Sequence, residues 1–191
     1  MRVSVPAARS ARFYEDAPTW QDADGSRHWV TRGGNFVVVA THAAPGATLV
    51  RDALAQSDEY MVLLPQGTPG QVAAANAAIA CEGDDLLIVP PGASTVVAPQ
   101  GGWLYRIFSR HAGDLAARAT NAADYAADYA DGAPHVAPLV AWPAPVGGYK
   151  LRHYRLAEYA RGDTTMRLFR SSHLMVNVFL DLRGNIGGFH R

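Results

Sequence analysis

The stretch from Glu82 to Thr95, E-G-D-D-L-L-I-V-P-P-G-A-S-T, constrains the fold more than any other part of the chain. A turn at Gly83-Asp84-Asp85 leads into the apolar run Leu86–Val89, which stops at Pro90-Pro91-Gly92. Proline lacks the backbone donor that a strand ladder needs, and glycine lets the chain reverse its direction. The stretch therefore predicts a short buried strand held between two turns.

Similar β-rich runs, each bounded by Gly, Pro, Asn or Asp, recur throughout residues 27–110. They are His28–Val30, Asn35–His42, Thr48–Val50, Glu59–Leu64, Gly70–Ala74, Ala77–Cys81, Leu86–Val89, Ser94–Ala98 and Trp103–Phe108. The Ala-rich run around Asn76 favours helix by propensity, but its two alternating arms predict a strand pair. Short strands at this spacing are typical of a β-sandwich or a closed barrel, in which closure removes exposed sheet edges.

After Arg110 the pattern becomes helical. The Ala-rich segment Leu115–Tyr129 predicts a helix, with Asp114 near its start as an N-cap. The segment Pro134–Pro145 carries four prolines and predicts an extended connector. Residues 111–148 are therefore expected to link the barrel to the C-terminal segment.

Two stretches, Pro45–Gly67 and Glu82–Thr95, resemble the paired motifs of the cupin superfamily. The first cupin motif reads G-x5-H-x-H-x(3,4)-E-x6-G and the second reads G-x5-P-x-G-x2-H-x3-N. Pro90-x-Gly92 matches the second motif, although the opening glycine, Gly83, stands one residue early. The resemblance implies an all-β fold, a cupin-type antiparallel β-barrel or jelly roll over residues 27–110, preceded by an N-terminal arm over residues 1–26.

The metal-binding positions of these motifs have mostly changed. Aligning the first motif on Gly46 places Asp52 and Leu54 at the two histidine positions and Glu59 at the glutamate position. In the second motif Thr95 stands where the third histidine would be. A carboxylate, an aliphatic group and a hydroxyl do not replace three imidazoles as ligands for a divalent transition metal. We therefore expect a barrel without a metal cofactor.

The resemblance implies that Asp52, Glu59 and Thr95 face the barrel interior and could bind a ligand there. Two carboxyl groups in a half-apolar cavity would repel each other, which raises the pKa of one of them and suits acid-base chemistry. Arg106 is a further ligand-binding candidate. In the alternative interpretation, Asp52 lies in a loop or pairs with Arg51 or Arg106, and the barrel is filled by its own side chains.

The C-terminal part of the chain repeats an earlier pattern. When the sequence is aligned with itself at an offset of 138 residues, Thr31–Gly46 aligns with Phe169–Gly184. The turn residues of the two stretches coincide, and so do their apolar strands. Counting on from Gly184, His190 has the spacing of the first histidine in a cupin motif. We therefore interpret residues 149–191 as the start of a second, incomplete cupin-like unit, with His190 as its candidate metal ligand. The alternative is that His190 is only a terminal histidine.

The other reactive side chains give no motif. None of the seven histidines has a second one at i+2 or i+4, the spacings that place two imidazoles on one face of a strand or helix. Cys81 is the single cysteine, so an internal disulfide is excluded and a buried structural thiol is expected. Gly33-Gly34 and Gly101-Gly102 lack the strand and helix context of a phosphate loop.

Composition narrows the class of partner. The formal net charge is zero, so no broad cationic surface is available for nucleic acid or anionic lipid. No apolar run approaches the length of a spanning helix, and the N-terminus does not resemble a secretory signal. We therefore expect a cytoplasmic protein with neither nucleic-acid nor membrane partners, and a homodimer because the unfinished second sheet leaves edges to cover.

Two functions remain open from the sequence. The first is a metal-free cupin barrel that serves as a structural unit or binds a small molecule such as a sugar or a small carboxylic acid. The second is a metal-dependent two-barrel cupin enzyme, a dioxygenase, isomerase or decarboxylase, whose second barrel holds a divalent transition metal and is truncated here. A third, less supported possibility is a sensory cupin domain.

Overall fold

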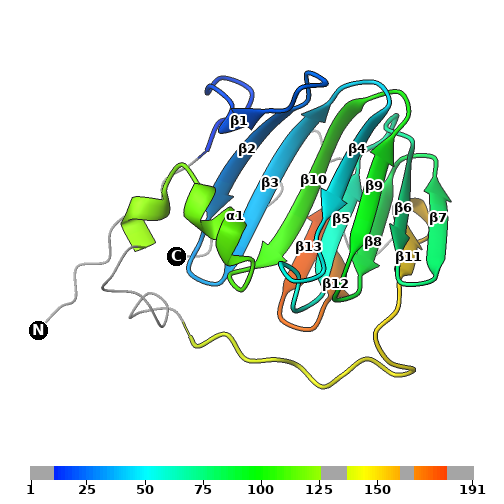
Figure 1. Ribbon diagram of the computed structural model, residues 1–191. Helices are drawn as coiled ribbons and strands as arrows, with labels where there is room; N and C mark the ends of the chain where they lie inside the picture. Colours follow the sequence, from blue (N-terminus) through cyan, green and yellow to red (C-terminus); the bar gives the residue numbers. More distant parts are fainter. Residues whose placement is uncertain (1–10, 126–136, 160–165, 180–191) are drawn as a thin grey trace, which may run out of the picture.

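The computed structural model describes residues 11–125, 137–159 and 166–179, and its strands form two large antiparallel sheets packed face to face and a separate two-stranded sheet, β12-β13 (Figure 1). The larger sheet has the order β1-β2-β3-β10-β5-β8-β11 and the smaller one β4-β9-β6-β7. The strands are β1 (Trp20–Gln21), β2 (Arg27–Arg32), β3 (Phe36–Ala43), β4 (Ala47–Arg51), β5 (Tyr60–Leu64), β6 (Gly70–Ala74), β7 (Ala77–Cys81), β8 (Asp85–Val89), β9 (Ser94–Ala98), β10 (Gly102–Ser109), β11 (Arg152–Arg155), β12 (Met166–Arg170) and β13 (Met175–Phe179). The predicted all-β cupin-type jelly roll is confirmed.

The main core lies between the two sheets and consists of alternate residues of each strand. Val37 and Val39 of β3 and Val62 of β5 meet Val72 of β6 and Val96 of β9, and all five are at most 1% exposed. Successive side chains of a strand point to opposite faces, so the residues between these lie on the outside of the barrel. Tyr60, Leu64, Leu104 and Phe108 also belong to this inner set.

The Ala-rich run around Asn76 forms the predicted hairpin, since β6 and β7 pair from Gly70↔Cys81 to Ala74↔Ala77. The tight reversal places Ala75 in the left-handed region, at φ 51°. Cross-strand pairing therefore overrides the helix propensity of alanine here.

The predicted helix Leu115–Tyr129 is wrong in its length over the described residues. Helix α1 covers only Gly113–Arg118, and a separate 3₁₀ turn, η1, covers Ala122–Tyr125. Between them the side chain of Asn121 accepts a hydrogen bond from Arg32 N at 3.0 Å and donates one to Arg32 O at 2.8 Å. The Asn121 side chain thus pairs with both backbone groups of Arg32 at the end of β2. Hydrogen bonds from a side chain to the backbone compete with helical hydrogen bonds, and here they interrupt the helix. Residues 126–129 lie outside the described residues.

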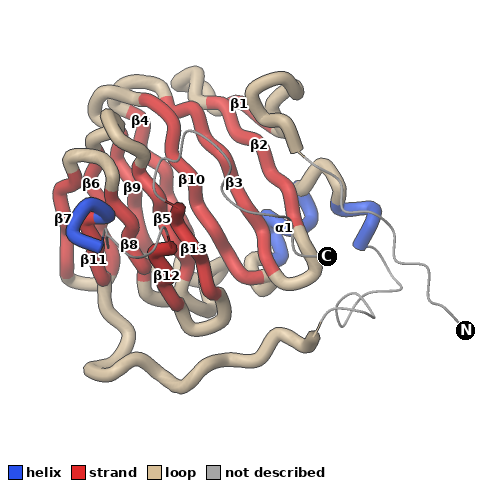
Figure 2. Tube along the Cα trace, turned by 180° about the vertical axis from the view of Figure 1, so that it is seen from behind, coloured by secondary structure: helices blue, strands red, loops and turns tan. Residues whose placement is uncertain are grey.

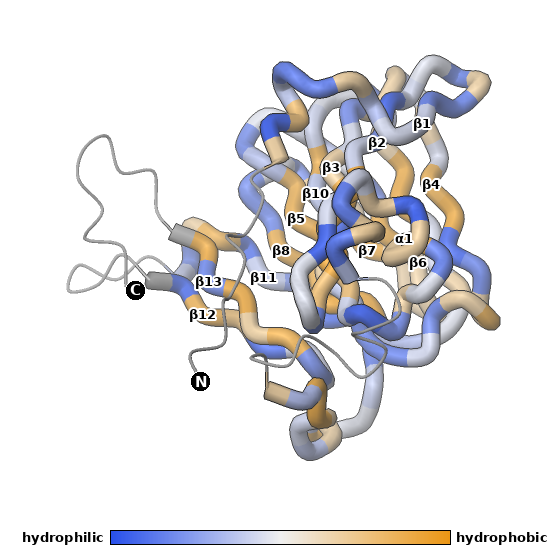
Figure 3. The backbone as a smooth tube through the Cα atoms, turned by 90° about the vertical axis from the view of Figure 1, so that its left-hand side faces the viewer, coloured by the Kyte–Doolittle hydropathy of each residue, from blue (hydrophilic) through white to orange (hydrophobic). Residues whose placement is uncertain are grey.

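The C-terminal segments cover the outer face of the larger sheet. Strand β11 pairs with β8, from Arg152↔Ile88 to Arg155↔Asp85, and the 3₁₀ turn η3 (Leu156–Tyr159) follows it. The β12–β13 hairpin then packs on the outer residues of β5 and β8, where Phe169 joins Met61 and Ile88 in a second apolar cluster. Figure 2 shows the hairpin against this face, and Figure 3 shows hydrophobic residues along both of its strands.

The β12–β13 hairpin has the same register as β2–β3, displaced by 138 residues. Arg32 pairs with Val37 as Arg170 pairs with Met175, and Thr31 pairs with Val38 as Phe169 pairs with Val176. The pairing thus supports the sequence repeat, while the second cupin-like unit over residues 149–191 stays a prediction. Its first strand, β11, nevertheless belongs to the sheet of the barrel. No helix of the described residues is long and apolar enough to cross a membrane.

Candidate functional site

Asp52 does not face the barrel interior, so the predicted position of this side chain is wrong. It is exposed in the loop after β4, where Oδ1 accepts a hydrogen bond from Leu54 N at 2.7 Å. Leu54 itself is 99% exposed. The loop leaves the sheet directly after Arg51, which places both residues beyond the barrel wall.

Glu59 and Thr95 lie on the outer faces of their sheets, which also corrects their predicted position. Glu59 is fully buried, but its Oε1 accepts a hydrogen bond from Arg152 Nη2 at 2.8 Å and its Oε2 accepts one from Ser172 N at 2.8 Å. Both partners belong to the C-terminal segments outside the barrel. Thr95 is half-buried between Ser94 and Val96, and these two neighbours are the inward residues.

The inward residues are therefore Arg51, Tyr60 and Ser94, each one position away from a predicted candidate. Because side chains alternate along a strand, an offset of one residue moves every side chain to the opposite face. The Tyr60 hydroxyl lies 2.9 Å from Ser94 Oγ, and the Tyr60 ring stacks on Phe108 with centroids 4.6 Å apart. Burial raises the pKa of Tyr60, so the hydroxyl remains a neutral hydrogen-bonding group.

Arg106 faces the interior, as a ligand-binding candidate should. It shares the inner face of β10 with Leu104 and Phe108 and is only 6% exposed. It lines a cavity of about 240 Å³ near the seam between β2 and β4, which α1 covers. The other lining residues are Trp20, Asp22, His28, Thr48, Leu49, Val50, Arg51, Asp114, Leu115 and Arg118.

Arg51, the second guanidinium of this cavity, is fully paired. Its two Nη atoms donate to the carboxylate of Asp114 on α1 at 2.5 and 2.9 Å, and its Nε donates to Gln56 Oε1 at 2.9 Å. Hydrogen bonding to Arg51 is the main cause that lowers the pKa of Asp114. Asp114, predicted as an N-cap, makes no side-chain cap; Ala112 holds the cap position. The carboxylate instead neutralises Arg51.

Arg106 has no such partner. Among the described residues no carboxylate forms an ion pair with it, and its buried Nε has no hydrogen-bond acceptor. Burial is the main cause that lowers the pKa of Arg106, and the charge of Arg51 lowers it further, while Tyr60 and the carboxylate of Asp22 act in the opposite direction. A buried cation without a counter-ion is costly, because desolvation is not offset by attraction. The site thus has an unmatched positive charge directed into a cavity.

A stack of three side chains forms the opposite wall of the cavity. The indole of Trp20 lies between the imidazole of His28, at 4.4 Å between centroids, and the guanidinium of Arg118, at 3.7 Å. His28 Nε2 lies 2.7 Å from Asp22 Oδ2, and His28 Nδ1 lies 3.0 Å from Thr41 Oγ1. Burial lowers the pKa of His28, so the imidazole is neutral near pH 7.

The interior does not fit the transition metal that cupins of the common type hold. Two guanidinium groups, Arg51 and Arg106, occupy the barrel interior, and they repel a divalent cation. The one imidazole on this cavity, His28, already has Asp22 and Thr41 as partners. The donor set of nitrogen and carboxylate ligands that such a metal requires is therefore missing.

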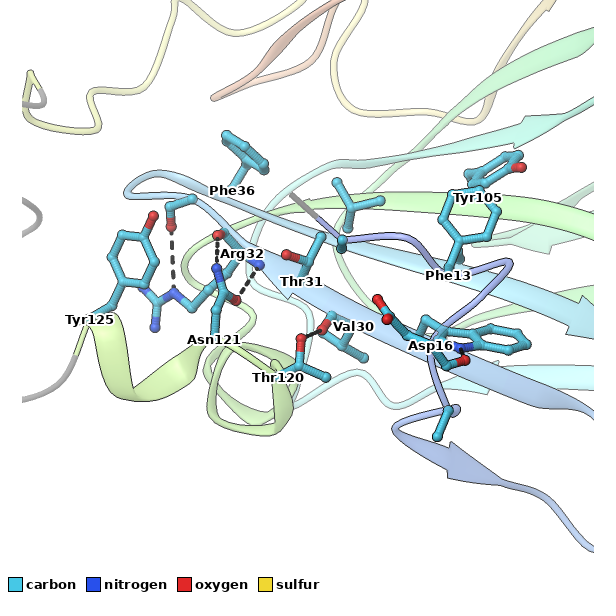
Figure 4. Close-up of a pocket in the computed structure, with 16 residues that line it drawn as sticks. Phe13, Asp16, Val30, Thr31, Arg32, Phe36, Tyr105, Thr120, Asn121 and Tyr125 are labelled. Atoms are coloured by element: carbon cyan, nitrogen blue, oxygen red, sulfur yellow. Dashed lines mark hydrogen bonds between the residues drawn. The ribbon is translucent and has the colours of Figure 1, made fainter. Parts of the chain in front are cut away.

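A second cavity, of about 280 Å³, lies outside the barrel on the faces of β2 and β3 (Figure 4). Aromatic side chains dominate its wall, among them Phe13, Phe36 and Tyr105. Its cation, Arg32, lies 4.8 Å from the ring of Tyr125 and donates from Nε to Gly33 O at 3.4 Å. This groove is apolar, and its charged group already has partners.

Two clusters of metal-ligating side chains also occur among the described residues. One consists of Asp58, His111 and His173, and the other of Cys81, Asp85 and His153. The first cluster joins three segments that are distant in sequence, and in the second only His153 is distant from the neighbouring Cys81 and Asp85. A search for histidine pairs at i+2 or i+4 could therefore find neither cluster. Cys81 is buried as predicted. His190, the candidate ligand of the second unit, lies outside the described residues.

No protein-family model matches the sequence, and no curated protein matches it. Among solved structures, an RmlC-like cupin from Shewanella frigidimarina aligns with 18% identity and a TM-score of 0.45, over 54% of this chain and 91% of its own length. KdgF from Halomonas sp. aligns with 16% identity and a TM-score of 0.44, over 55% and 94%. Oxalate decarboxylase from Bacillus subtilis aligns with 16% identity and a TM-score of 0.41, over 51% and 28%. The cupin-type fold itself is evident in the sheet order and pairings of this chain.

Proposed function

We propose that this barrel is a binding module for a small organic carboxylate, which Arg106 holds, and that its interior binds no metal. The observation that carries the proposal is the buried guanidinium of Arg106, which lines the inner cavity and forms no ion pair with any carboxylate of the described part of the chain. The planar fork of a guanidinium matches a carboxylate in shape and charge. A bound carboxylate would supply the missing counter-ion.

The charges of the cavity favour a single negative charge on the ligand. Three guanidinium groups line it, those of Arg51, Arg106 and Arg118, against the carboxylates of Asp22 and Asp114. With His28 neutral, one positive charge remains unmatched. A phosphate dianion would exceed this charge and approach two carboxylates, whereas a monocarboxylate would match it.

The size and walls of the cavity favour a small, partly apolar ligand. Its volume of about 240 Å³ suits a short-chain acid or a sugar acid. Leu49, Leu115 and the face of Trp20 offer apolar contact, and Thr48 offers a hydroxyl. This mixture agrees with the expectation of a sugar or small carboxylic acid as ligand.

A thermal-shift screen of small monocarboxylates tests the proposal, followed by calorimetry on each compound that raises the melting temperature. Arg106→Met should weaken binding by about 10-fold to 100-fold, because a hydrogen bond to a charged group contributes about 1.5–3 kcal/mol. Arg27→Met removes an exposed arginine of β2 and should leave binding unchanged. Asp52→Ala should also have no effect, because Asp52 lies outside the barrel. Equal affinity of the Arg106→Met variant and the unmodified protein would contradict the proposal.

A second candidate function is that of a two-barrel metal enzyme, and the repeated hairpin register favours it. Here the barrel over residues 27–110 would be the structural unit and a second unit would hold a divalent transition metal. Metal analysis of a protein that contains a complete second unit tests this candidate. One equivalent of metal, lost when His190 is replaced by alanine, would support it; metal that persists in this variant would not.

We further propose that the protein forms a homodimer through its C-terminal hairpin. Leu168 and Met175 of this hairpin are 60% and 54% exposed, although both are large and apolar. Light scattering after size exclusion should report twice the chain mass, and the Leu168→Glu variant should be monomeric. A monomer at every concentration would contradict this proposal.

A further inference from the structure

The cluster of Asp58, His111 and His173 brings together three segments that are distant in sequence. Asp58 lies in the loop before β5, His111 in the loop after β10, and His173 in the turn of the β12–β13 hairpin. The two imidazole rings are 5.0 Å apart between centroids and almost perpendicular, at 84°. The cluster therefore joins the barrel to the hairpin that covers its outer face.

Three groups converge on one oxygen of this cluster. Asp58 Oδ2 lies 3.1 Å from His111 Nδ1, 2.9 Å from His173 Nδ1 and 2.6 Å from Ser109 Oγ. Within the described residues, the other oxygen, Oδ1, has a hydrogen-bond contact only with Ser57 Oγ, at 3.5 Å. His173 Nδ1 also lies 3.1 Å from Ser172 Oγ. The cluster thus places two ring nitrogens and one carboxylate oxygen around a single point, as metal ligands are placed.

We propose that Asp58, His111 and His173 form a binding site for a divalent transition metal, with Zn²⁺ as the best match. Zinc binds imidazole nitrogen at about 2.0–2.1 Å and carboxylate oxygen at about 2.0–2.2 Å, so its tetrahedral ligands lie roughly 3.3 Å from one another. The nitrogen-to-oxygen distances of 2.9 and 3.1 Å here need only a small expansion to reach this value. Two imidazoles and one carboxylate are also the ligand types that zinc prefers.

The surroundings fix the carboxylate and leave room for a further ligand. The hydroxyl of Ser109 donates to Asp58, and Gln56 Nε2 donates to the main-chain oxygen of Asp58 at 2.5 Å. Such supporting hydrogen bonds orient metal ligands. The side chain of Asp58 is 7% exposed and that of His111 is 41% exposed, so the metal would be held from the barrel side and open to water on the other.

The second cluster, Cys81, Asp85 and His153, is a weaker metal site. Asp85 Oδ2 already accepts hydrogen bonds from Glu82 N at 3.1 Å and Gly83 N at 3.0 Å, which fix the turn before β8. Its Oδ1 lies 2.7 Å from His153 Nε2. Burial raises the pKa of Cys81 to about 12, which keeps this thiol protonated. This cluster therefore serves as the control.

Calorimetry with Zn²⁺ on the full chain, purified without a histidine tag and freed of metal by a chelator, tests the site. The unmodified protein should bind one equivalent, and His111→Gln and His173→Gln should each weaken binding by at least about 100-fold. His153→Gln and Arg106→Met should bind zinc as the unmodified protein does. Unchanged circular dichroism of each variant without metal shows that the fold is intact.

The spectrum of bound Co²⁺ separates the two clusters. Co²⁺ at Asp58, His111 and His173 should show no thiolate charge-transfer band, whereas Co²⁺ at Cys81 should show one. Absence of micromolar zinc binding, or zinc binding that survives His173→Gln, would overturn the proposal. Carboxylate binding at Arg106 is measured on the His111→Gln and His173→Gln variants and should be unaffected there, so the two proposals can fail separately.

Discussion

Glu59, directly before β5, and Arg106, in β10, are both buried charged groups, and among the described residues only Glu59 forms an ion pair. Glu59, on the outer face, accepts hydrogen bonds from Arg152 and from the backbone of Ser172. Arg106, on the inner face, forms no ion pair within the described residues; its Nε lacks an acceptor there, as does that of Arg152. The paired charge can fix a neighbouring segment in place, whereas the buried charge beside the cavity is the one that we propose binds a carboxylate.

We expect the largest effect on stability when the ion pair between Glu59 and Arg152 is broken. Arg152→Met would leave the carboxylate of Glu59 buried without its counter-ion and should lower the free energy of unfolding by about 3 kcal/mol. Urea denaturation measures this change. Arg155→Met, on the exposed side of the same strand, should change the free energy of unfolding by less than about 0.5 kcal/mol. If both variants lose the same stability, the Glu59–Arg152 pair does not hold β11 in place.

Replacement of Arg106 should change the free energy of unfolding in the opposite direction. Arg106→Met removes a buried charge that has no counter-ion and should raise the free energy of unfolding by about 1–2 kcal/mol in the absence of ligand. Urea denaturation in a buffer without carboxylates measures it, since acetate or citrate could occupy the site. A loss of stability on this substitution would show that Arg106 has a structural role.

A smaller effect concerns the wall of the inner cavity. Burial holds the pKa of His28 below its ordinary value of 6.5, so the unfolded chain binds this proton more readily than the folded one. The contribution of neutral His28 to the free energy of unfolding is therefore fully present above about pH 6.5. It is lost as the pH falls from there towards the lowered pKa of the folded protein. Melting temperatures at pH 7.5 and 5.5 should differ more for the unmodified protein than for His28→Gln. If the melting temperatures of the two proteins change equally between these pH values, the pKa of His28 is not lowered in the folded protein.

The smallest effect is expected at Cys81. Because burial raises the pKa of this thiol to about 12, the folded protein should react negligibly with a thiol reagent at pH 8. The same reagent should modify one thiol per chain in denaturant. Rapid labelling of the folded protein would show that the end of β7 opens readily.

The positions of the strands could be predicted from sequence because turn residues mark their ends. Pro90-Pro91-Gly92 ends β8, and the hairpin around Asn76 follows its two alternating arms. The inward face could not be predicted in the same way. In β5 both faces are apolar, because the core covers one and the C-terminal hairpin covers the other, so Y-M-V-L-L has no polar alternation to reveal which face is which.

The inward side chains therefore lie one residue away from Asp52, Glu59 and Thr95, whereas Arg106 itself lies on the inner face and stays a predicted ligand-binding residue. In β10 the inner residues Leu104 and Phe108 flank Arg106, and a charge between two apolar residues of one face is a signal that sequence alone offers. The loop containing Asp58 and the turn containing His173 come together only through packing of the hairpin on the barrel. Tertiary contact of this kind has no local sequence pattern.

A spectrum of the arginine Nε–Hε groups tests the central claim most directly. Nitrogen-15 NMR of the protein, titrated with the monocarboxylate that gives the largest thermal shift, follows each guanidinium separately, and the Arg106→Met spectrum assigns the signal of interest. We predict that the Arg106 signal moves saturably with the affinity found by calorimetry, while that of Arg51 changes little because Asp114 and Gln56 hold it. A titration that moves only exposed arginines and leaves Arg106 in place would contradict the account.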